Sequence, residues 1–267
     1  MKRKEPIIQI SDVSKVFHDS KEPLVALEGV NLEIADGEFT VLIGPSGCGK
    51  STLLYLIAGF DHPSEGSILL DGKLVDKPGP DRGFVFQDYA LFRWKTVLGN
   101  VMFGLLNNGW KKKDARQKAM EYIDLVDLRG FEDAYPHTLS GGMKQRVGIA
   151  RALAYDPKVL LMDEPFGALD AQTRKYMQME MARIWQKMRK TVVFVTHSVI
   201  EAVFLADRIV VMTARPGQVK GIIEVDLPRP RDYTGERYLA VRQQILDLLG
   251  EEVMKEISQS GTVHPSS

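Results

Sequence analysis

The sequence feature that most restricts the fold is an eight-residue segment, Gly44-Pro45-Ser46-Gly47-Cys48-Gly49-Lys50-Ser51. It matches the pattern Gly-x4-Gly-Lys-Ser/Thr at every required position. An apolar, β-branched run at residues 39–43 precedes it and predicts a buried strand, and residues 51–58 have the spacing of a helix. A glycine-rich loop between a strand and a helix points backbone N–H groups and the positive helix end at phosphate oxygens. The sequence therefore predicts a phosphate-binding loop in an α/β fold.

Two side chains of this loop have predicted roles of their own. Lys50 supplies a mobile positive charge toward the β- and γ-phosphates, and the Ser51 hydroxyl is placed to ligate Mg²⁺. The other predicted nucleotide contacts in this region are Gly44, Pro45, Ser46, Gly47, Cys48, Gly49 and Thr52. Because Cys48 lies inside the loop, a bulky group on its thiol should block nucleotide binding, and nearby Lys50 is expected to lower the pKa of that thiol.

Composition excludes several classes of protein. Lys plus Arg and Asp plus Glu both number 35, so the formal net charge is zero, whereas a chain that coats nucleic acid should be strongly basic. A single cysteine excludes an internal disulfide and a cysteine-rich metal site. The first twelve residues do not develop the apolar region of a signal peptide. No stretch approaches the ~18 unbroken apolar residues of a membrane helix, so another chain would have to hold this protein at a membrane.

The N-terminal region has the alternation of strands. Apolar residues occupy every second position over residues 30–34, which predicts a strand with one buried face. The adjacent Val16 and Phe17 point to opposite faces of an extended segment, so one of them is expected to lie outside the core. Phe17 would either stack on a purine ring or cap a small sheet, and the residues by themselves favour neither.

Polar side chains follow three predicted strands at the points where the strands end. Gln87 follows residues 84–86, Asp163 and Glu164 close an apolar run that begins at residue 159, and His197 follows residues 191–196. Ligands gather at the carboxyl ends of strands in such folds. Each residue alone could be an ordinary strand-ending residue, but three such ends favour one site. Asp163 can hold Mg²⁺ through a water, and Glu164 can accept a proton from an attacking water.

Residues 88–155 have a helical texture. Ser140 is a favoured N-cap residue, and it is followed by Gly141 and Gly142 before an evident helix, so this second helix N-terminus also suits a phosphate. An ordinary capped helix is the alternative. The aromatic-rich residues 89–103 form either the core of this region or a groove for a partner, and the residues alone favour core.

Taken together, these motifs resemble the ATP-binding cassette subunit of an ABC transporter over residues 7–225, in an order that is highly specific for that family. Residues 44–51 resemble its Walker A loop, Gln87 its Q-loop glutamine, 139–146 its signature, 159–164 its Walker B strand, 168–170 its D-loop, and His197 its switch histidine.

The resemblance implies a role for each matching residue. Glu164 would polarise the attacking water, and His197 would contact the γ-phosphate. Mg²⁺ would be held by Ser51, Gln87 and Asp163. Phe17 would stack on adenine. The signature residues Ser140, Gly141 and Gly142, together with Asp170 of the D-loop, would serve nucleotide binding, with Ser140 reaching the γ-phosphate across a dimer interface.

The sequence departs from the family pattern at three places. Phe17 stands where tyrosine is usual, which keeps the stacking surface but removes a hydroxyl. Met143 replaces the commonest glutamine of the signature. Arg93 stands where related sequences often have proline, in a region that borders a groove for a short permease helix in the family. There Trp94 lies between Arg93 and Lys95, which suits an amphipathic rim better than a sealed core.

The expected fold class is α/β: a P-loop NTPase (RecA-like) core sheet with an antiparallel β subdomain and an inserted α-helical subdomain. One ATPase domain is expected over residues 1–232, with a core of 1–87 and 156–232 and a helical subdomain of 88–155. A C-terminal helix would follow over 233–257 and a disordered tail over 258–267.

The expected function is ATP hydrolysis with Mg²⁺ that powers uptake of a small solute. Residues 143–146, 215–217 and 226–231 are similar to the nitrate, sulfonate and taurine type of importer ATPase. The implied partners are an integral-membrane permease, a second copy of the chain and, indirectly, a solute-binding protein, at the cytoplasmic face of the inner membrane. The alternatives are a soluble cassette clamp on ribosomes or DNA, or an exporter or lipid-extraction ATPase.

Overall fold

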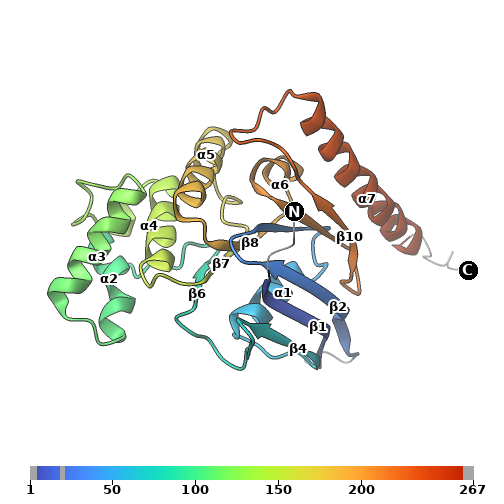
Figure 1. Ribbon diagram of the computed structural model, residues 1–267, viewed down its shortest axis with the longest axis horizontal. Helices are drawn as coiled ribbons and strands as arrows, with labels where there is room; N and C mark the ends of the chain where they lie inside the picture. The colour runs from blue at the N-terminus through green and yellow to red at the C-terminus, as the bar shows by residue number, and fades with distance from the viewer. Residues whose placement is uncertain (1–4, 19–21, 261–267) are drawn as a thin grey trace, which may run out of the picture. The chain divides into compact units, whose positions relative to one another are not determined.

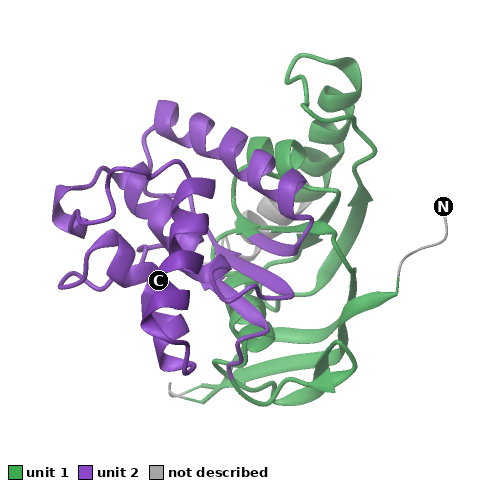
Figure 2. Ribbon diagram, turned by 60° about the vertical axis from the view of Figure 1, so that its left-hand side comes forward, with its two compact units in different colours: residues 1–77, 195–267 green, residues 78–194 purple. Residues whose placement is uncertain are grey.

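The computed structural model describes residues 5–18 and 22–260, with side chains described up to residue 250. The chain divides into two compact units, one of residues 1–77 and 195–267 and one of residues 78–194 (Figure 2). The first unit contains the phosphate loop, and the second contains the predicted helical region. The two units are therefore described in turn.

The first unit contains an antiparallel sheet with the strand order β2-β1-β4-β5 (Figure 1). Its strands are β1 (Pro6–Phe17), β2 (Leu24–Ala35), β4 (Glu65–Leu70) and β5 (Lys73–Leu74). Over residues 30–34 of β2 buried and exposed positions alternate, with Val30, Leu32 and Ile34 buried. The predicted one-sided strand is confirmed, because a period of two puts every second side chain on the core face.

A second set of strands in this unit has the order β10-β9-β3. β3 (Phe39–Ile43) is parallel to β9 (Arg208–Met212), and β10 (Val219–Glu224) is antiparallel to β9. All five residues of β3 are buried, as are all five of β9. Strands covered on both faces read as unbroken apolar runs, which is why residues 39–43 show no alternation.

Three helices complete the first unit. They are α1 (Lys50–Ala58), α6 (Val199–Leu205) and α7 (Glu236–Ser260). α7 buries Tyr238 and Ile245, and the Lys220 ammonium of β10 donates a 2.9 Å hydrogen bond to the carbonyl of Leu248. The C-terminal helix therefore has one face that packs against the rest of this unit. Residues 258–260 of the expected tail belong to α7, and residues 261–267 lie outside the described residues.

In the second unit the strand order is β8-β7-β6. β6 (Arg82–Val85) is parallel to β7 (Val159–Asp163), and the first four residues of β8 (Thr191–Thr196) belong to this unit. The strand predicted over residues 84–86 ends at Val85. The Phe86 carbonyl accepts a 3.2 Å hydrogen bond from the amide of Tyr89, so it closes a turn instead of extending the ladder.

The helices of this unit are α2 (Val97–Asn107), α3 (Lys112–Leu125), α4 (Gly141–Leu153) and α5 (Ala171–Met188), with a short 3-10 turn η1 (Pro136–Thr138) before α4. α2, α3 and α4 pack against one another (Figure 1, green to yellow). The basic residues at the start of α3 are exposed, while Ala115, Ala119 and Tyr122 of the same helix are buried. This confirms that the basic run is a solvated helix start.

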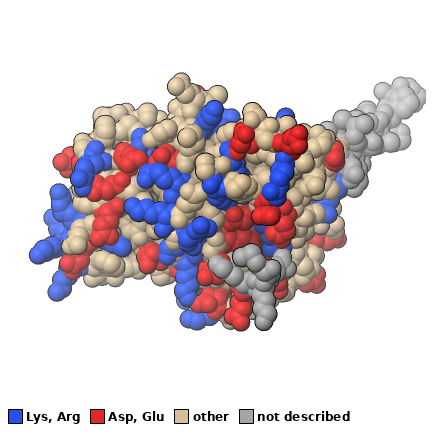
Figure 3. Space-filling model, turned by 45° about the horizontal axis from the view of Figure 1, so that its top comes forward, with Lys and Arg blue, Asp and Glu red and all other residues tan. Residues whose placement is uncertain are grey.

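Two surface properties bear on function. Over the part of the chain that the structure describes, no helix is both long and apolar enough to cross a membrane. On the face drawn in Figure 3, Lys and Arg side chains are intermixed with Asp and Glu side chains. Interspersed charges of both signs do not build the single-sign field that concentrates a polyanion.

Candidate functional site

The phosphate loop joins β3 to α1 and depends on glycine at two left-handed positions. Gly47 has φ 76°, and Gly49, the N-cap of α1, has φ 89°. A Cβ atom on Gly49 would lie 2.8 Å from the carbonyl oxygen of Ala26, which is backbone and cannot give way cheaply. Both the φ angle and the lack of space therefore require glycine at 49.

Lys50 occupies the first turn of α1 and is only 4% exposed. Its ammonium donates 2.8 Å hydrogen bonds to the carbonyl oxygens of Gly44 and Pro45, within its own loop. Ser51 and Thr52 follow it on the helix and are half-buried. A phosphate oxygen carries a full charge where a carbonyl carries a dipole, so a bound phosphate would compete well for this ammonium.

Cys48 is fully buried at the base of the loop. Its sulfur lies 3.7 Å from the Lys50 ammonium, which lowers the pKa of the thiol, but desolvation by burial is the larger effect and the pKa is raised overall. The predicted lowering of this pKa is therefore wrong. The error arose because proximity to Lys50 can be read from the sequence, whereas burial of the thiolate cannot.

The other two predicted residues of the first unit lie at element ends. Phe17 ends β1 opposite Leu24 and, like Val16, is half-buried, so neither side chain lies in the core. The Lys15 ammonium lies 5.0 Å from the centroid of the Phe17 ring and contacts Asp61 at 2.7 Å. His197 is exposed between β8 and α6, as the prediction of a polar residue at this strand end requires.

Two carboxylates close β7 in the second unit. All five residues of this strand are buried, and Asp163 at its end is 5% exposed. Glu164 follows with φ 40°, a left-handed conformation that costs a residue with a side chain on the order of 1–3 kcal/mol. The amide of Gly167 donates a 3.0 Å hydrogen bond to the Glu164 carbonyl, which helps to hold this turn.

The structure brings Gln87 and Glu164 into the same corner of the second unit. A Cβ atom on Gly167 would lie 3.6 Å from the Gln87 amide nitrogen and 3.8 Å from a Glu164 carboxylate oxygen. Gln87 itself is exposed, whereas Glu164 is half-buried. The amide and the carboxylate, which follow two parallel strands, therefore both lie beside Gly167.

The N-termini of α4 and α5 also lie together in this unit. The Ser140 hydroxyl caps α4 by accepting a hydrogen bond from the Met143 amide at 3.3 Å, and Asp170 caps α5 by accepting from the amides of Gln172 and Thr173 at 3.1 and 3.0 Å. The bonds that Asp170 accepts lower its pKa, the one from Thr173 most. A Cβ atom on Gly142 would lie 2.8 Å from a Thr173 methyl group, so the two helix starts are in contact.

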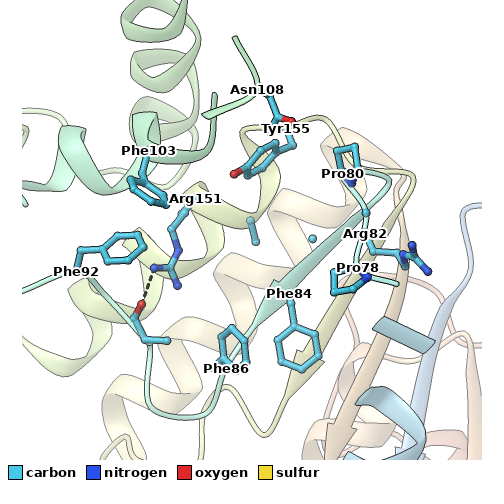
Figure 4. Close-up of a pocket in the computed structure, with 14 residues that line it drawn as sticks. Pro78, Pro80, Arg82, Phe84, Phe86, Phe92, Phe103, Asn108, Arg151 and Tyr155 are labelled. Atoms are coloured by element: carbon cyan, nitrogen blue, oxygen red, sulfur yellow. Dashed lines mark hydrogen bonds between the residues drawn. The ribbon is translucent and has the colours of Figure 1, made fainter. Parts of the chain in front are cut away.

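A groove of about 470 Å³ opens on the second unit between β6, α2 and α4 (Figure 4). Its aromatic lining comprises Phe84, Phe86, Phe92, Phe103 and Tyr155, and it is also lined by Arg151 and by Arg82, which pairs with Asp81 at 3.0 Å. Trp94 lies in the loop before α2 and is 72% exposed. Within residues 89–103 the core is formed by the buried face of α2, whereas Trp94 precedes that helix and is exposed, as expected of an amphipathic rim.

Two residues that the sequence analysis did not single out organise this groove. Asn100 of α2 is fully buried, and its side chain bonds the backbone of Phe92, Lys95 and Thr96. Arg151 of α4 bonds the carbonyls of Tyr89 and Ala90. Asn100 could have been found from the sequence, because it is a polar residue on the apolar face of a predicted helix. No local pattern distinguishes Arg151.

The donor atoms suit Mg²⁺ bound together with a nucleotide. Within residues 5–18 and 22–250, no group of three His, Cys, Asp or Glu side chains could hold a metal by itself. Mg²⁺ usually keeps waters and binds one or two carboxylates plus substrate phosphates. A serine hydroxyl, a glutamine amide and one carboxylate, from Ser51, Gln87 and Asp163, are oxygen donors of that kind.

Comparison with known proteins places the chain in a family. Residues 27–167 match the family model described as ABC transporter. The chain is 48% identical over 237 residues to a nitrate import ATP-binding protein of Synechocystis (89% of each chain) and 46% identical over 239 residues to an aliphatic sulfonates import ATP-binding protein of Bacillus cereus (90% of this chain, 94% of that one).

Among solved structures, the chain resembles an ATP-binding cassette in a dimeric post-hydrolysis state bound to ADP and Pi. The TM-score is 0.72 at 33% identity, over 83% of this chain and all of that one. The P-loop α/β fold predicted from the sequence is thereby confirmed. The chain belongs to the ABC transporter family and is an ATPase that works with ATP and Mg²⁺.

Proposed function

We propose that this ATPase powers import of a small solute of the nitrate, sulfonate or taurine kind through a separate membrane permease. Two relatives with close to half of their residues identical are named as import ATP-binding proteins for nitrate and for aliphatic sulfonates. The chain would act as a peripheral subunit at the cytoplasmic face of the membrane, with a solute-binding protein delivering the solute to the permease. No observation favours the ribosome, DNA or exporter alternatives.

The proposed hydrolytic mechanism rests on one observation: Glu164, at the end of the buried strand β7, and Gln87 both lie beside Gly167. In this proposal Glu164 is the general base for the attacking water, and Asp163, Ser51 and Gln87 hold Mg²⁺. Lys50 and the loop amides bind the phosphates, His197 contacts the γ-phosphate, and Phe17 stacks on adenine. Catalysis of phosphoryl transfer depends mainly on positioning and electrostatics, which these groups supply.

A second copy of the chain is part of the proposal. The solved relative is described as a dimer bound to ADP and Pi. The capped N-terminus of α4, with Ser140 exposed and Gly141 and Gly142 behind it, would bind the γ-phosphate in the partner copy. In this proposal each copy consists of one ATPase domain with a helical insertion over residues 88–155, followed by α7.

The aromatic groove of the second unit is the proposed permease contact. It combines a large apolar lining with cationic side chains and has an exposed tryptophan nearby, the residue types that contribute most at protein interfaces. A short amphipathic helix presenting apolar side chains would fill it.

Replacing Glu164 tests the proposed chemistry. Glu164→Gln keeps the shape of the side chain but removes the base, so ATP binding should persist while turnover falls on the order of 10²- to 10⁴-fold. Steady-state phosphate release and equilibrium nucleotide binding measure the two effects. The matched control is Glu121→Gln, which removes a carboxylate on the exposed face of α3 and should leave phosphate release and nucleotide binding unchanged. Near-normal hydrolysis by Glu164→Gln would remove that residue from the role.

A further inference from the structure

The backbone directly after Gln87 is strained. Tyr89 has φ 59° and Ala90 has φ 45°, so two consecutive residues with side chains adopt the left-handed conformation. The local hydrogen bonds are short-range ones, from the Tyr89 amide to the Phe86 carbonyl at 3.2 Å and from the Ala90 amide to the Asp88 carbonyl at 2.6 Å. Such a turn persists only when contacts from outside the segment hold it.

Arg151 supplies that outside contact. One terminal nitrogen of its guanidinium donates to the Ala90 carbonyl at 2.5 Å, the hydrogen bond drawn in Figure 4, and the other donates to the Tyr89 carbonyl at 3.0 Å. The planar fork of a guanidinium suits two neighbouring acceptors, which a lysine ammonium cannot match. In the described part of the chain no carboxylate pairs with Arg151, and its guanidinium carbon lies 5.7 Å from the centroid of the Phe92 ring. Both strained residues and one wall of the groove therefore contact one side chain.

Burial of the guanidinium is consistent with this arrangement. Desolvation lowers the pKa of Arg151, although the group stays protonated at neutral pH. A charge that has lost much of its water needs strong acceptors, and the two carbonyls are the ones it has. Breaking the two hydrogen bonds to the turn would therefore be energetically costly for Arg151.

The next part of the same loop is held separately. Asn100 accepts a hydrogen bond from the Phe92 amide at 2.8 Å and donates to the carbonyls of Phe92, Lys95 and Thr96 at 3.1, 3.1 and 3.0 Å. Both the nitrogen and the oxygen of its side-chain amide are thus bonded to the backbone of this loop. Asn100 therefore fixes residues 92–96 onto α2, and Arg151 fixes residues 89–90 onto α4.

We propose that Arg151 is a positioning residue, which holds the turn at Tyr89 and Ala90 and thereby sets the direction of Gln87 for hydrolysis. The link to hydrolysis depends on the proposed role of Gln87. The hydrogen bonds by which Arg151 holds the turn are independent of that role.

Hydrogen exchange tests the hold on the turn directly. Arg151→Met keeps much of the apolar stem and removes the fork, so the amides of Tyr89 and Ala90 should exchange at least tenfold faster. The Phe92 amide, which Asn100 holds, should keep its protection. Arg183→Met is the matched control, because Arg183 donates to the Leu125 carbonyl from α5, outside this loop. Unchanged exchange at Tyr89 and Ala90 in folded Arg151→Met would overturn the proposal.

Hydrolysis kinetics test the effect on Gln87. Arg151→Met should lower kcat several-fold with less than a twofold change in KM for ATP, and Arg183→Met should change neither. Adding Ala90→Gly should recover part of the lost kcat, because glycine adopts a left-handed φ without steric cost. Arg151→Lys, which keeps the charge without the fork, should remain impaired. No recovery by Ala90→Gly, or full activity of Arg151→Lys, would contradict a role through the turn.

The same measurements separate the two proposals. If Glu164→Gln abolishes turnover while Arg151→Met exchanges faster but keeps its kcat, the positioning role is wrong and the active-site proposal stands. If Glu164→Gln hydrolyses ATP normally, the assignment of the site is wrong whatever Arg151 does. Should Arg151→Met fail to fold, Arg151→Lys takes its place in the exchange experiment, with a smaller expected acceleration at the same two amides.

Discussion

At the residue scale, Cys48 shows how two opposing effects set the chemistry of one group. The Lys50 ammonium at 3.7 Å stabilises the thiolate, and full burial destabilises it by more, so the thiol pKa is raised. The same burial puts the sulfur where a Cβ atom on Gly44 would be 2.7 Å away, so the loop base has no room for added atoms. A thiol in this setting should react slowly, and any group added to it should distort the loop.

We therefore expect slow alkylation of Cys48 at neutral pH. Because the pKa is raised, the thiolate fraction stays small until the pH exceeds the ordinary range of a cysteine, and the reaction rate should keep rising there. Bound ATP should slow the reaction further, and the alkylated protein should no longer bind nucleotide. Mass spectrometry and nucleotide binding across a pH series measure this, with Cys48→Ala as the unreactive control. Complete modification with unchanged affinity would contradict the proposed steric overlap.

At the element scale, α2 packs one face into the core, whereas the loop between β6 and α2 carries exposed side chains. The Thr96 hydroxyl caps α2 by accepting from the Gly99 amide at 3.1 Å, so the helix pattern begins only after Trp94. Within α2, Val97 and Val101 are fully buried. Residues 89–95 lie outside that periodicity, and their side chains are free to line or border the groove.

Trp94→Ala should therefore weaken coupling to transport more than it changes basal hydrolysis. The ring is 72% exposed in the free chain, so its loss should leave thermal stability nearly unchanged while removing a large apolar contact to the permease. Permease-stimulated ATPase activity in proteoliposomes is the measurement. Trp110→Ala, an exposed tryptophan that follows α2, is the matched control and should behave like the unmodified chain. A large drop in melting temperature for Trp94→Ala would instead indicate a core residue.

At the scale of the whole molecule, the proposed site needs two copies of the chain. ATP carries several negative charges, and one loop with one lysine surrounds the γ-phosphate only in part. A second capped helix N-terminus, that of α4 from the partner copy, would complete the enclosure. Hydrolysis would then release the interface between the copies.

Mixing two inactive variants tests this arrangement. Lys50→Ala should lose nucleotide binding in its own copy, and Ser140→Arg should spoil the site of its partner, so each homodimer should be inactive. Their heterodimer contains one site with intact Lys50 and intact Ser140. Mixing should restore ATPase activity, or nucleotide trapping if turnover requires both sites. Normal hydrolysis by monomeric Ser140→Arg would show that α4 contributes nothing to a second copy.

Local patterns were sufficient for much of the fold and for the candidate residues. The buried strands β3 and β7 could be predicted from runs that are apolar apart from Thr40 and Asp163, and the caps at Ser140 and Asp170 are short-range hydrogen bonds. Because each of these features depends on neighbours within a few positions, the residue order alone specifies them.

Tertiary structure decided what depends on burial and on distant contacts. The raised pKa of Cys48 reflects how deeply the loop base is buried, and the left-handed turn at Tyr89 and Ala90 is held by Arg151, which is 62 and 61 positions away from them. The sequence by itself determined which groups are present and which strand or helix end carries each one. Only the packing of elements distant in sequence set their desolvation and their partners, because both depend on which atoms surround a group in space.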